Sequence, residues 1–532
     1  MVWDVIVVGG GIAGLTSAAY ASRSRLKVLL LEKNEKCGGL VNSFEKDGFV
    51  FDGGIRALEN AGIIIPMLRD LGIEIEFLKS PVSVGIEDRI IHINSKENLE
   101  DYKNLLESLY PESKDDVDEV IRIIKNIMAE MEVLYGVENP LFVDLKKDYK
   151  KLLNYGPWLL RFLKTLYAIN RMKEPVESFL EKRIKNRSLR DIISQHFFKG
   201  TPAFFAMSYF YLYTDYIYPK GGIYKLAKAV EDKAIEMGAK IQKNTKIVKV
   251  DPAKNLVFDE MGNSYQYSNL VWAADLKSLY LNVIADGLEE RYRNEFEKEK
   301  KKVLKGKGTD SIFTVFIGVK KPVDYFSKIA SGHFFYTPSR VGLGEMRYFE
   351  LNRILTNFEK VKKEEMLDWL KRFVELNTFE ISIPALRDFS LSPKDQTGLI
   401  VSLLFDYELT RMLYDAGWYE EFREILSKNI IDTLSNTVYP GIKEDIIFSI
   451  TSTPLTIENY VGSSEGSIVG WSFTEPLPVS SDMLSVKNAV RTSIPNILKA
   501  GQWSYSPTGV PTCIMTGKLA ADALSKSTKN RT

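Results

Sequence analysis

Three glycines and one glutamate near the start of the chain have the spacing of a nucleotide phosphate site. The glycines are Gly9, Gly11 and Gly14, and Glu32 follows 18 positions after the last of them. In such a motif the first glycine permits a tight turn, the second lets a pyrophosphate approach the backbone, and the third allows close packing of a helix. The Glu32 carboxylate can accept hydrogen bonds from both hydroxyls of a ribose without a 2′-phosphate. The pattern predicts an adenine dinucleotide site.

These residues need a strand, a helix and a second strand to hold them. The β-branched run at 5–8 is typical of a buried strand, and 28–31 forms the next strand, which ends at Glu32. The helix between them points free backbone N–H groups and its positive dipole end at the phosphates. We therefore expect Ile12 and Ala13 to contact the nucleotide. A glycine-rich loop without a nucleotide is the alternative.

Composition limits the class of protein. The chain has 532 residues, more than one core usually supports, so two or more domains are expected. Its net charge is +1, which gives no electrostatic case for nucleic acid. Two cysteines cannot form a disulfide framework, and His92, His196 and His333 show no metal spacing. Because an early first strand leaves no room for a signal peptide and no long apolar run occurs, we expect a cytoplasmic protein, either free or peripheral on a membrane.

A second motif occupies the other end of the chain, over 496–524. A strand is expected to end at Ala500 and Gly501, and a helix to begin near Val510 and Pro511, because proline in a first helical turn needs no N–H partner. The positive end of that helix dipole favours negative charge on a ligand. Cys513 lies in its first turns, either as a low-pKa thiol or as a small packed residue.

Together these motifs resemble the FAD-binding proteins of the amine oxidase and phytoene desaturase superfamily. The resemblance also rests on Gly38-Gly39, on the F-D-G-G run at 51–54 and on the P-K-G-G run at 219–222. It implies bound FAD, with the helix near Val510 at the flavin ring. The cofactor-binding residues that it implies are Gly9, Gly11, Ile12, Ala13, Gly14, Glu32, Lys33, Gly38, Gly39, Leu40, Gly54, Ile55, Arg56, Val248 through its backbone, Ala273, Ala274, Gly501, Gln502, Gly509, Val510 and Pro511.

Two positions depart from the pattern of that family. The carotenoid desaturases usually have a proline where Ile55 stands, and Gln502 replaces a usual acidic residue beside the ribityl chain. The resemblance still predicts an α/β protein with a Rossmann-like FAD-binding domain, an interleaved α+β substrate domain and a helical cap. The FAD-binding domain is expected to comprise three segments, 1–75, 218–290 and 486–532. The helical cap, with substrate and membrane contacts, is expected at 76–217, and the substrate domain at 291–485.

Two apolar stretches each leave two interpretations open. The segment 146–173 is amphipathic, with an apolar face and basic residues roughly opposite. It is either an interfacial helix on anionic lipid, with Tyr155 and Trp158 at headgroup level, or a helix packed on the core. The aromatic segment 203–218 either lines a tunnel for a long apolar substrate or belongs to the core. The apolar face of 146–173 comprises Leu152, Leu159, Leu160, Leu163, Leu166 and Tyr167.

The resemblance implies an enzyme that acts on C–C bonds of a long apolar isoprenoid, carotenoid or other lipid. The expected reaction is desaturation by hydride transfer to flavin N5, with Arg56 and Lys220 as polar side chains near the flavin. A polyene isomerase or double-bond reductase on the same scaffold is one alternative, and a non-enzymatic carrier of prenyl lipid is another. The sequence indicates neither the electron acceptor nor the oligomeric state.

Overall fold

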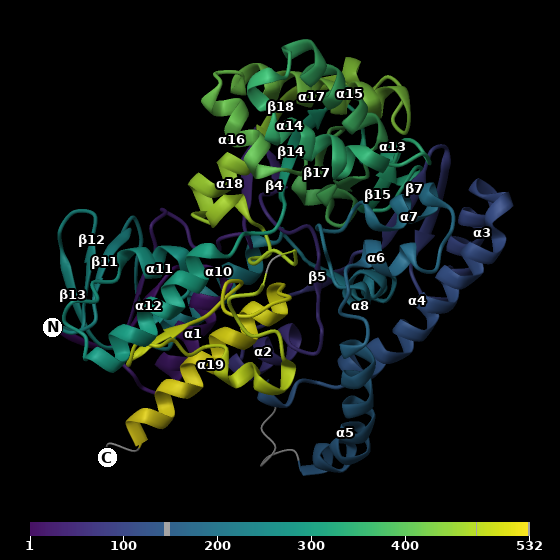
Figure 1. Cartoon of the computed structure of the whole chain (residues 1–532). Coiled ribbons are helices and arrows are strands. Elements are labelled where there is room, and N and C mark those ends of the chain that lie inside the picture. The colour runs from purple at the N-terminus through teal and green to yellow at the C-terminus, as the bar shows by residue number, and fades with distance from the viewer. Residues whose placement is uncertain (143–148, 475, 530–532) are drawn as a thin grey trace.

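Three regions make up the computed structural model, which describes residues 1–142, 149–474 and 476–529 (Figure 1). A sheet domain at the lower left combines purple, teal and yellow segments, so distant parts of the chain lie together there. A second sheet domain, mostly green, lies above it, and a blue helical region lies to one side. The predicted fold class, an α/β dinucleotide-binding domain interleaved with a second domain and a helical region, is confirmed.

The first domain is built on a seven-stranded sheet. Its strand order is β10–β2–β1–β13–β12–β11, and β19 also pairs with β13. The pairs that join β10, β2, β1, β13 and β19 are all parallel, so their carboxyl ends meet at one edge. The strands are β1 (Val2–Val8), β2 (Val28–Leu31), β10 (Lys240–Gln242), β11 (Ile247–Asp251), β12 (Leu256–Asp259), β13 (Ser264–Trp272) and β19 (Ile497–Lys499).

Helices cover both faces of this sheet because its central strands are apolar on both sides. Val5 and Val7 pack under α1, α10 and α19, whereas Ile6 and Val8 face α11 and α12. Phe296 and Val303 of α12 are fully buried there, so the second segment of this domain extends to Lys305, beyond the expected boundary at 290. The helices are α1 (Ile12–Arg23), α2 (Ile64–Leu71), α10 (Tyr224–Glu236), α11 (Leu276–Asn282), α12 (Glu290–Lys305) and α19 (Val510–Lys529).

The second domain contains another seven-stranded sheet, in the order β18–β14–β17–β16–β15–β7–β8. The strands β7 and β8 come from the segment expected to be a helical cap, and β7 pairs in parallel with β15. The expected boundary at 76 is therefore wrong for residues 82–93, which complete this sheet. The strands are β7 (Val82–Ile86), β8 (Arg89–Ile93), β14 (Ser311–Val319), β15 (His333–Thr337), β16 (Phe379–Ser382), β17 (Thr397–Phe405) and β18 (Ile446–Ser452).

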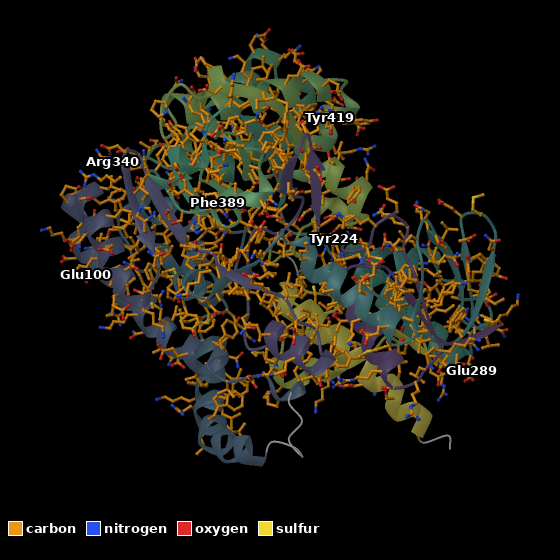
Figure 2. All side chains as sticks on the ribbon, turned by 180° about the vertical axis from the view of Figure 1, so that it is seen from behind. Glu100, Tyr224, Glu289, Arg340, Phe389 and Tyr419 are labelled. Atoms are coloured by element: carbon orange, nitrogen blue, oxygen red, sulfur yellow. The ribbon has the colours of Figure 1, made fainter. Side chains whose placement is uncertain are left out.

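Helices cover this second sheet as well. The apolar side chains of α13 to α17 form its core with the inward residues of β14 and β17, including Phe313, Val315 and Val401. Tyr419 at the start of α17 lies in this domain in Figure 2, which shows the molecule from behind. The helices are α13 (Val323–Ser327), α14 (Phe349–Thr356), α15 (Lys363–Leu376), α16 (Tyr407–Asp415), α17 (Tyr419–Asn436) and α18 (Pro454–Val461).

Two small sheets join the domains. Phe49 and Phe51 of the β3–β4 hairpin pack on Phe316 and Ile400 of the second domain. A three-stranded sheet, β5–β9–β6, lies beside this junction. Figure 2 shows Tyr224 of α10 where the domains meet. The strands are β3 (Ser43–Lys46), β4 (Phe49–Asp52), β5 (Leu58–Glu59), β6 (Phe77–Lys79) and β9 (Tyr216–Pro219).

Within the residues that the structure describes, the helices α3 to α9 form the helical region, and α5 extends from it at the edge of the molecule (Figure 1). Within the described residues, no helix is long and apolar enough to cross a bilayer. The helices are α3 (Leu99–Leu109), α4 (Lys114–Tyr135), α5 (Tyr149–Asn170), α6 (Val176–Glu181), α7 (Arg187–Ser194), α8 (Ala203–Met207) and α9 (Tyr209–Tyr213).

Candidate cofactor and substrate site

The carboxyl ends of four parallel strands meet at one edge of the first sheet. Gly9 follows β1, Glu32 follows β2, Ala273 follows β13 and Gly501 follows β19 after one intervening residue. Short backbone hydrogen bonds fasten the connecting loops: the Ala273 N–H donates to the Val8 carbonyl at 2.8 Å, and the Ala500 N–H donates to the Trp272 carbonyl at 2.9 Å. Ligands of open parallel sheets bind at this edge.

The glycine loop has the geometry that its sequence predicts. Gly9 has φ +102°, a conformation that side chains rarely adopt, and a Cβ there would lie 2.9 Å from the Ala273 carbonyl oxygen. A Cβ on Gly14 would lie 1.9 Å from the Gly9 carbonyl oxygen, so only glycine lets α1 approach β1 this closely. In contrast, a Cβ on Gly11 would meet no atom within 4 Å. The loop is therefore open at Gly11, where no side chain caps the N-terminus of α1.

Glu32 is buried at the floor of this loop. Its Oε2 accepts a hydrogen bond from the Gly10 N–H at 2.6 Å, and its Oε1 accepts one from the Asn34 N–H at 2.9 Å. The carboxylate thus fixes the glycine loop to the end of β2. A carboxylate with several acceptor positions keeps the capacity to bind a ribose as well.

A cavity of about 590 Å³ opens along this edge and is lined by all three segments of the domain. Its volume suits a large ligand, since small-molecule sites typically measure roughly 300–1,000 Å³. The lining includes most of the predicted cofactor-binding residues: Gly9, Gly11, Ile12, Ala13, Glu32, Lys33, Gly38, Gly39, Leu40, Ile55, Ala273, Ala274, Gly501, Gln502, Gly509 and Val510. An open glycine loop, an uncapped helix N-terminus and a buried carboxylate fit a dinucleotide.

Other predicted cofactor residues lie just outside this lining. Gly14 and Gly54 allow close backbone packing, since a Cβ on Gly54 would lie 2.0 Å from the Leu40 carbonyl oxygen. Val248 stands at a register shift between β11 and β12, where a bulge leaves a residue outside the ladder, while its neighbour Ile247 lines the cavity. Pro511 is buried in the first turn of α19.

The two predicted polar residues near the flavin lie in different surroundings. Arg56 is 4% exposed and donates hydrogen bonds to the carbonyls of Asp52 and Gly54 and to Ser402 Oγ, so it ties the first domain to β17. Lys220 is half exposed and forms an ion pair with Glu76 at 3.0 Å. Neither side chain lines the cavity, and Lys220 is held at the surface because its partner is a surface carboxylate.

Several lining residues were not singled out from the sequence. Thr245, Lys246, Asp275 and Ser463 contribute to the cavity wall, and Asp275 accepts hydrogen bonds from the backbone of Ser278 and Ser464. They come from short connections, and the residues predicted to bind the cofactor are their neighbours, such as Ala274. The glycine-containing run near Ser463 was the available signal, because it stands immediately after α18.

Both cysteines are packed residues. Burial raises the pKa of the Cys513 thiol to about 11 and that of Cys37 to about 12. Cys513 lines the cavity near the Thr508 hydroxyl, and Cys37 is fully buried. Neither is a thiolate at neutral pH, so the packed interpretation is the one that the structure favours. Among the described residues, no group of three His, Cys, Asp or Glu side chains is arranged to hold a metal ion.

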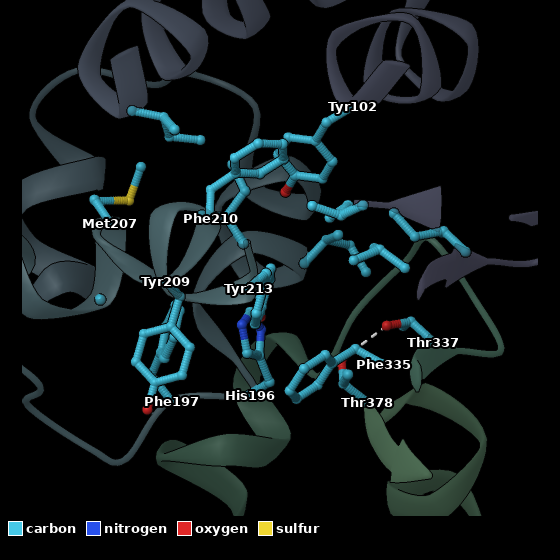
Figure 3. A pocket seen from close by; sticks show the side chains of 17 residues that line it. Tyr102, His196, Phe197, Met207, Tyr209, Phe210, Tyr213, Phe335, Thr337 and Thr378 are labelled. Atoms are coloured by element: carbon cyan, nitrogen blue, oxygen red, sulfur yellow. Dashed lines mark hydrogen bonds between the residues drawn. The ribbon is translucent and has the colours of Figure 1, made fainter. Parts of the chain in front are cut away.

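The aromatic segment contributes to a second, smaller cavity of about 60 Å³ (Figure 3). Its walls come from α8, α9, β7 and β15, and Figure 3 shows His196, Tyr213 and Phe335 side by side within it. The hydrogen bond between Thr337 and Thr378, at 2.8 Å, closes one side. The segment therefore serves both as core and as a pocket wall, so the two interpretations are not exclusive.

This aromatic pocket carries no charge near neutral pH. Burial lowers the pKa of His196 to about 3, so its imidazole stays neutral. Burial also raises the pKa of Tyr102, Tyr209 and Tyr213, so their hydroxyls stay protonated. A small uncharged pocket suits a hydrocarbon group.

The fold and the cavity define a class, the two-domain proteins with a Rossmann-like dinucleotide-binding domain. Residues 7–71 match the family model described as NAD(P)-binding Rossmann-like domain. The fold is shared with cyclohexylamine oxidase from Brevibacterium oxydans, at a TM-score of 0.58, 12% sequence identity, and coverage of 99% of this chain and 100% of that chain.

Curated relatives place the chain more narrowly. It is 23% identical to the chloroplastic prolycopene isomerase of Daucus carota, over 87% of this chain and 71% of that protein. It is 22% identical to the all-trans-retinol 13,14-reductase of Danio rerio (96% and 85% covered) and 21% identical to the 4,4′-diapophytoene desaturase of Staphylococcus haemolyticus (98% of each). The predicted resemblance to the oxidoreductases of the phytoene desaturase group is therefore confirmed.

Proposed function

We propose that the chain is an FAD-dependent oxidoreductase that acts on C–C bonds of a long apolar polyene or isoprenoid, with desaturation as its reaction. The observation that carries this proposal is the cavity that three distant segments build at the carboxyl edge of the sheet. Glu32 and the N-terminus of α1 suit the adenosine and pyrophosphate, and Gly509 and Val510 at the start of α19 suit the flavin ring. Bound flavin supplies the hydride acceptor.

The apolar surroundings support a hydrocarbon substrate. The aromatic pocket of Figure 3 lies between the helical region and the second sheet and is uncharged near neutral pH. Ring contacts continue from it toward the domain junction, since Tyr213 lies 5.9 Å from Tyr216 between ring centroids, and Tyr216 lies 5.4 Å from His333. A polyene can lie along such a series of rings without burying a polar group.

A flavin-dependent isomerase or double-bond reductase is the second candidate. The relatives favour it directly, because they include a prolycopene isomerase and a retinol reductase as well as desaturases. All three reactions need the same cofactor and the same apolar pocket. Turnover under anaerobic conditions separates them: a desaturase reduces its flavin, a reductase reoxidises reduced flavin, and an isomerase leaves the redox state unchanged.

We also propose that α5 contacts a membrane surface. Leu159, Leu160, Leu163 and Tyr167 are all exposed, with Leu160 at 74%, and Arg161 lies among them. This argues against the alternative of an ordinary helix whose apolar face packs on the core.

The buried side of α5 is formed by other residues than expected. Trp158 donates its indole N–H to the Val133 carbonyl of α4 at 2.7 Å, and Thr165 bonds Glu130. Trp158, which we expect at headgroup level, thus directs its N–H to α4. The expectations for Leu152 and Tyr155 fall on side chains outside the described ones.

The proposed function is tested by loading the purified protein with FAD and supplying phytoene, 4,4′-diapophytoene, prolycopene and all-trans-retinol in detergent micelles. Extension, isomerisation or saturation of one polyene, dependent on FAD, supports the proposal. A protein that binds FAD but changes none of them contradicts the substrate class. A protein that takes up no flavin contradicts the proposal as a whole.

A further inference from the structure

The Glu59 carboxylate lies between Gly509, which lines the cofactor cavity, and the aromatic residue Tyr216. It ends β5, and β5 contacts α19, the helix whose start lines the cavity. The neighbouring Leu58 is fully buried, whereas Glu59 keeps part of its surface open. No part of the dinucleotide motif contains this residue, and the function proposed above gives it no role.

Gly509 shows how closely this carboxylate approaches the cavity wall. A Cβ on Gly509 would lie 3.0 Å from Glu59 Oε1. The backbone of Gly509 does not have a positive φ, so its conformation alone does not require glycine. Because Gly509 has no side chain, the Glu59 carboxylate can lie directly against it, and Gly509 lines the cavity.

On its other side, Glu59 faces the aromatic series. It is paired with Tyr216 across the antiparallel β5–β9 ladder, and directly opposed residues project their side chains from the same face. Tyr216 in turn packs on Tyr213, which lines the aromatic pocket. Glu59 therefore lies behind Gly509 of the cavity wall on one side and beside Tyr216, next to the pocket residue Tyr213, on the other.

From this placement we infer that Glu59 is the acid–base residue of the site, exchanging a proton with the substrate carbon next to the one that exchanges a hydride with the flavin. The inference rests on the proposed function. In a desaturation, one C–H bond would break with its hydrogen leaving as a hydride, and bound flavin would accept that hydride and be reduced. The second C–H bond breaks as its electron pair forms the new C=C bond, and the Glu59 carboxylate takes that proton. In a reduction, the Glu59 carboxylic acid returns it.

The groups that surround Glu59 suit a proton exchange near neutral pH. Burial, together with the nearby Asp215 carboxylate, raises the pKa of Glu59 to about 7. The other titratable groups that interact electrostatically with Glu59 are Tyr135 of α4, Tyr209 of α9, Tyr216 of β9 and Cys513 of α19. Burial raises the pKa of each of them. In the described part of the chain, no lysine or arginine forms an ion pair with Glu59. A base whose pKa lies near the operating pH is the most effective one.

The first test is an infrared titration of the FAD-loaded full chain. The wild type is expected to show a carboxyl band that disappears near pH 7, and Glu59→Gln is expected to lack that band. Asp215→Asn is the matched control, because it removes the neighbouring carboxylate and keeps Glu59, so the band must remain and its transition must move to lower pH. A wild type without a carboxyl that titrates near neutrality, or a band that persists in Glu59→Gln, overturns the inference.

The second test measures turnover of the polyene accepted by the wild type. Glu59→Gln is expected to retain FAD, to lose about 100-fold or more in rate, as is typical when an acid–base group is removed, and to lose the limb of the pH–rate profile near pH 7. A smaller loss with FAD bound overturns the inference. If the wild type changes no polyene, the proposed function fails, and the infrared titration alone then decides whether Glu59 exchanges protons.

Discussion

Ser17 and Gly517 lie 500 positions apart, and the Ser17 hydroxyl donates a hydrogen bond to the Gly517 carbonyl at 3.0 Å. The bond joins α1, which carries the dinucleotide motif, to α19, which carries the carboxyl-terminal motif. A Cβ on Gly517 would lie 2.5 Å from the Ala13 carbonyl oxygen, so the two helices are in backbone contact. This contact holds the two ends of the chain in one cavity.

Gly517→Ala is expected to separate these helices. The added methyl group has no room, and overpacking of this kind typically costs about 1–3 kcal/mol. We expect a lower thermal midpoint and weaker retention of FAD, measured by melting and by flavin released on gel filtration. Gly156→Ala is the control, because Gly156 is also helical and a Cβ there meets no atom within 4 Å. Equal midpoints for the two variants would contradict the proposed role of the contact.

Substitution of Glu32 is expected to weaken FAD binding. Glu32→Ala removes a carboxylate that we expect to bind ribose, a loss of roughly 1.5–3 kcal/mol for hydrogen bonds to a charged group. Because Glu32 also accepts from Gly10 and Asn34, Glu32→Gln is the milder variant, since it keeps one acceptor oxygen. Fluorescence titration of the apoprotein with FAD measures both. An unchanged affinity in Glu32→Ala means that the ribose is held elsewhere.

The exposed apolar side of α5 is expected to bind anionic vesicles. Burying one leucine contributes about 1.5–3 kcal/mol, so the double change of Leu159 and Leu160 to serine is expected to weaken vesicle binding by more than about tenfold. Phe389→Ser is the control, because Phe389 is 71% exposed but lies in the substrate domain. Cosedimentation with vesicles, repeated at high salt, measures this. If the double variant binds vesicles as well as Phe389→Ser does, α5 does not form the membrane contact.

Stability is expected to depend on the charge of Glu59. Its pKa is about 7 in the folded chain against an ordinary value of 4.5, so the folded state holds the proton more tightly. The resulting stabilisation is present below pH 4.5 and is lost as the pH rises through 7. Glu59→Gln removes this loss. The free energy of unfolding of this variant, relative to that of the wild type, is therefore expected to increase by about 1–3 kcal/mol between acid and alkaline pH. Melting curves across that range measure it, and a constant difference between the two proteins contradicts the raised pKa.

The sequence predicts the cofactor domain well because its signals are local. The strand at 28–31 and the helix that begins at Val510 are where the glycine, acid and proline patterns indicate. In contrast, β7 joins the second sheet by pairing with β15. This pairing is reinforced by a hydrogen bond from the Ser331 N–H to the Ser83 hydroxyl, between residues that are 248 positions apart. No local pattern encodes such a pairing.

The same limit explains why the sequence indicates Lys220, but not Glu59, as a polar residue of the site. Lys220 follows a recognisable P-x-G-G run, but motif proximity does not tell which way a side chain points, and its ion pair with Glu76 holds it outside. Glu59 belongs to no motif. Its placement depends on the short β5–β9 ladder and on the approach of Gly509 from the other end of the chain.

Anaerobic mixing of the FAD-loaded protein with each polyene, while the visible flavin absorbance is followed, tests the proposed function most directly. For a desaturase, we predict loss of the oxidised flavin absorbance together with a longer conjugated product in equal amount. Reduced enzyme mixed with the same polyenes covers the reductase and isomerase alternatives. A bound flavin that stays oxidised with every polyene, in a protein whose reduced form also changes none of them, would contradict the assignment of a polyene oxidoreductase.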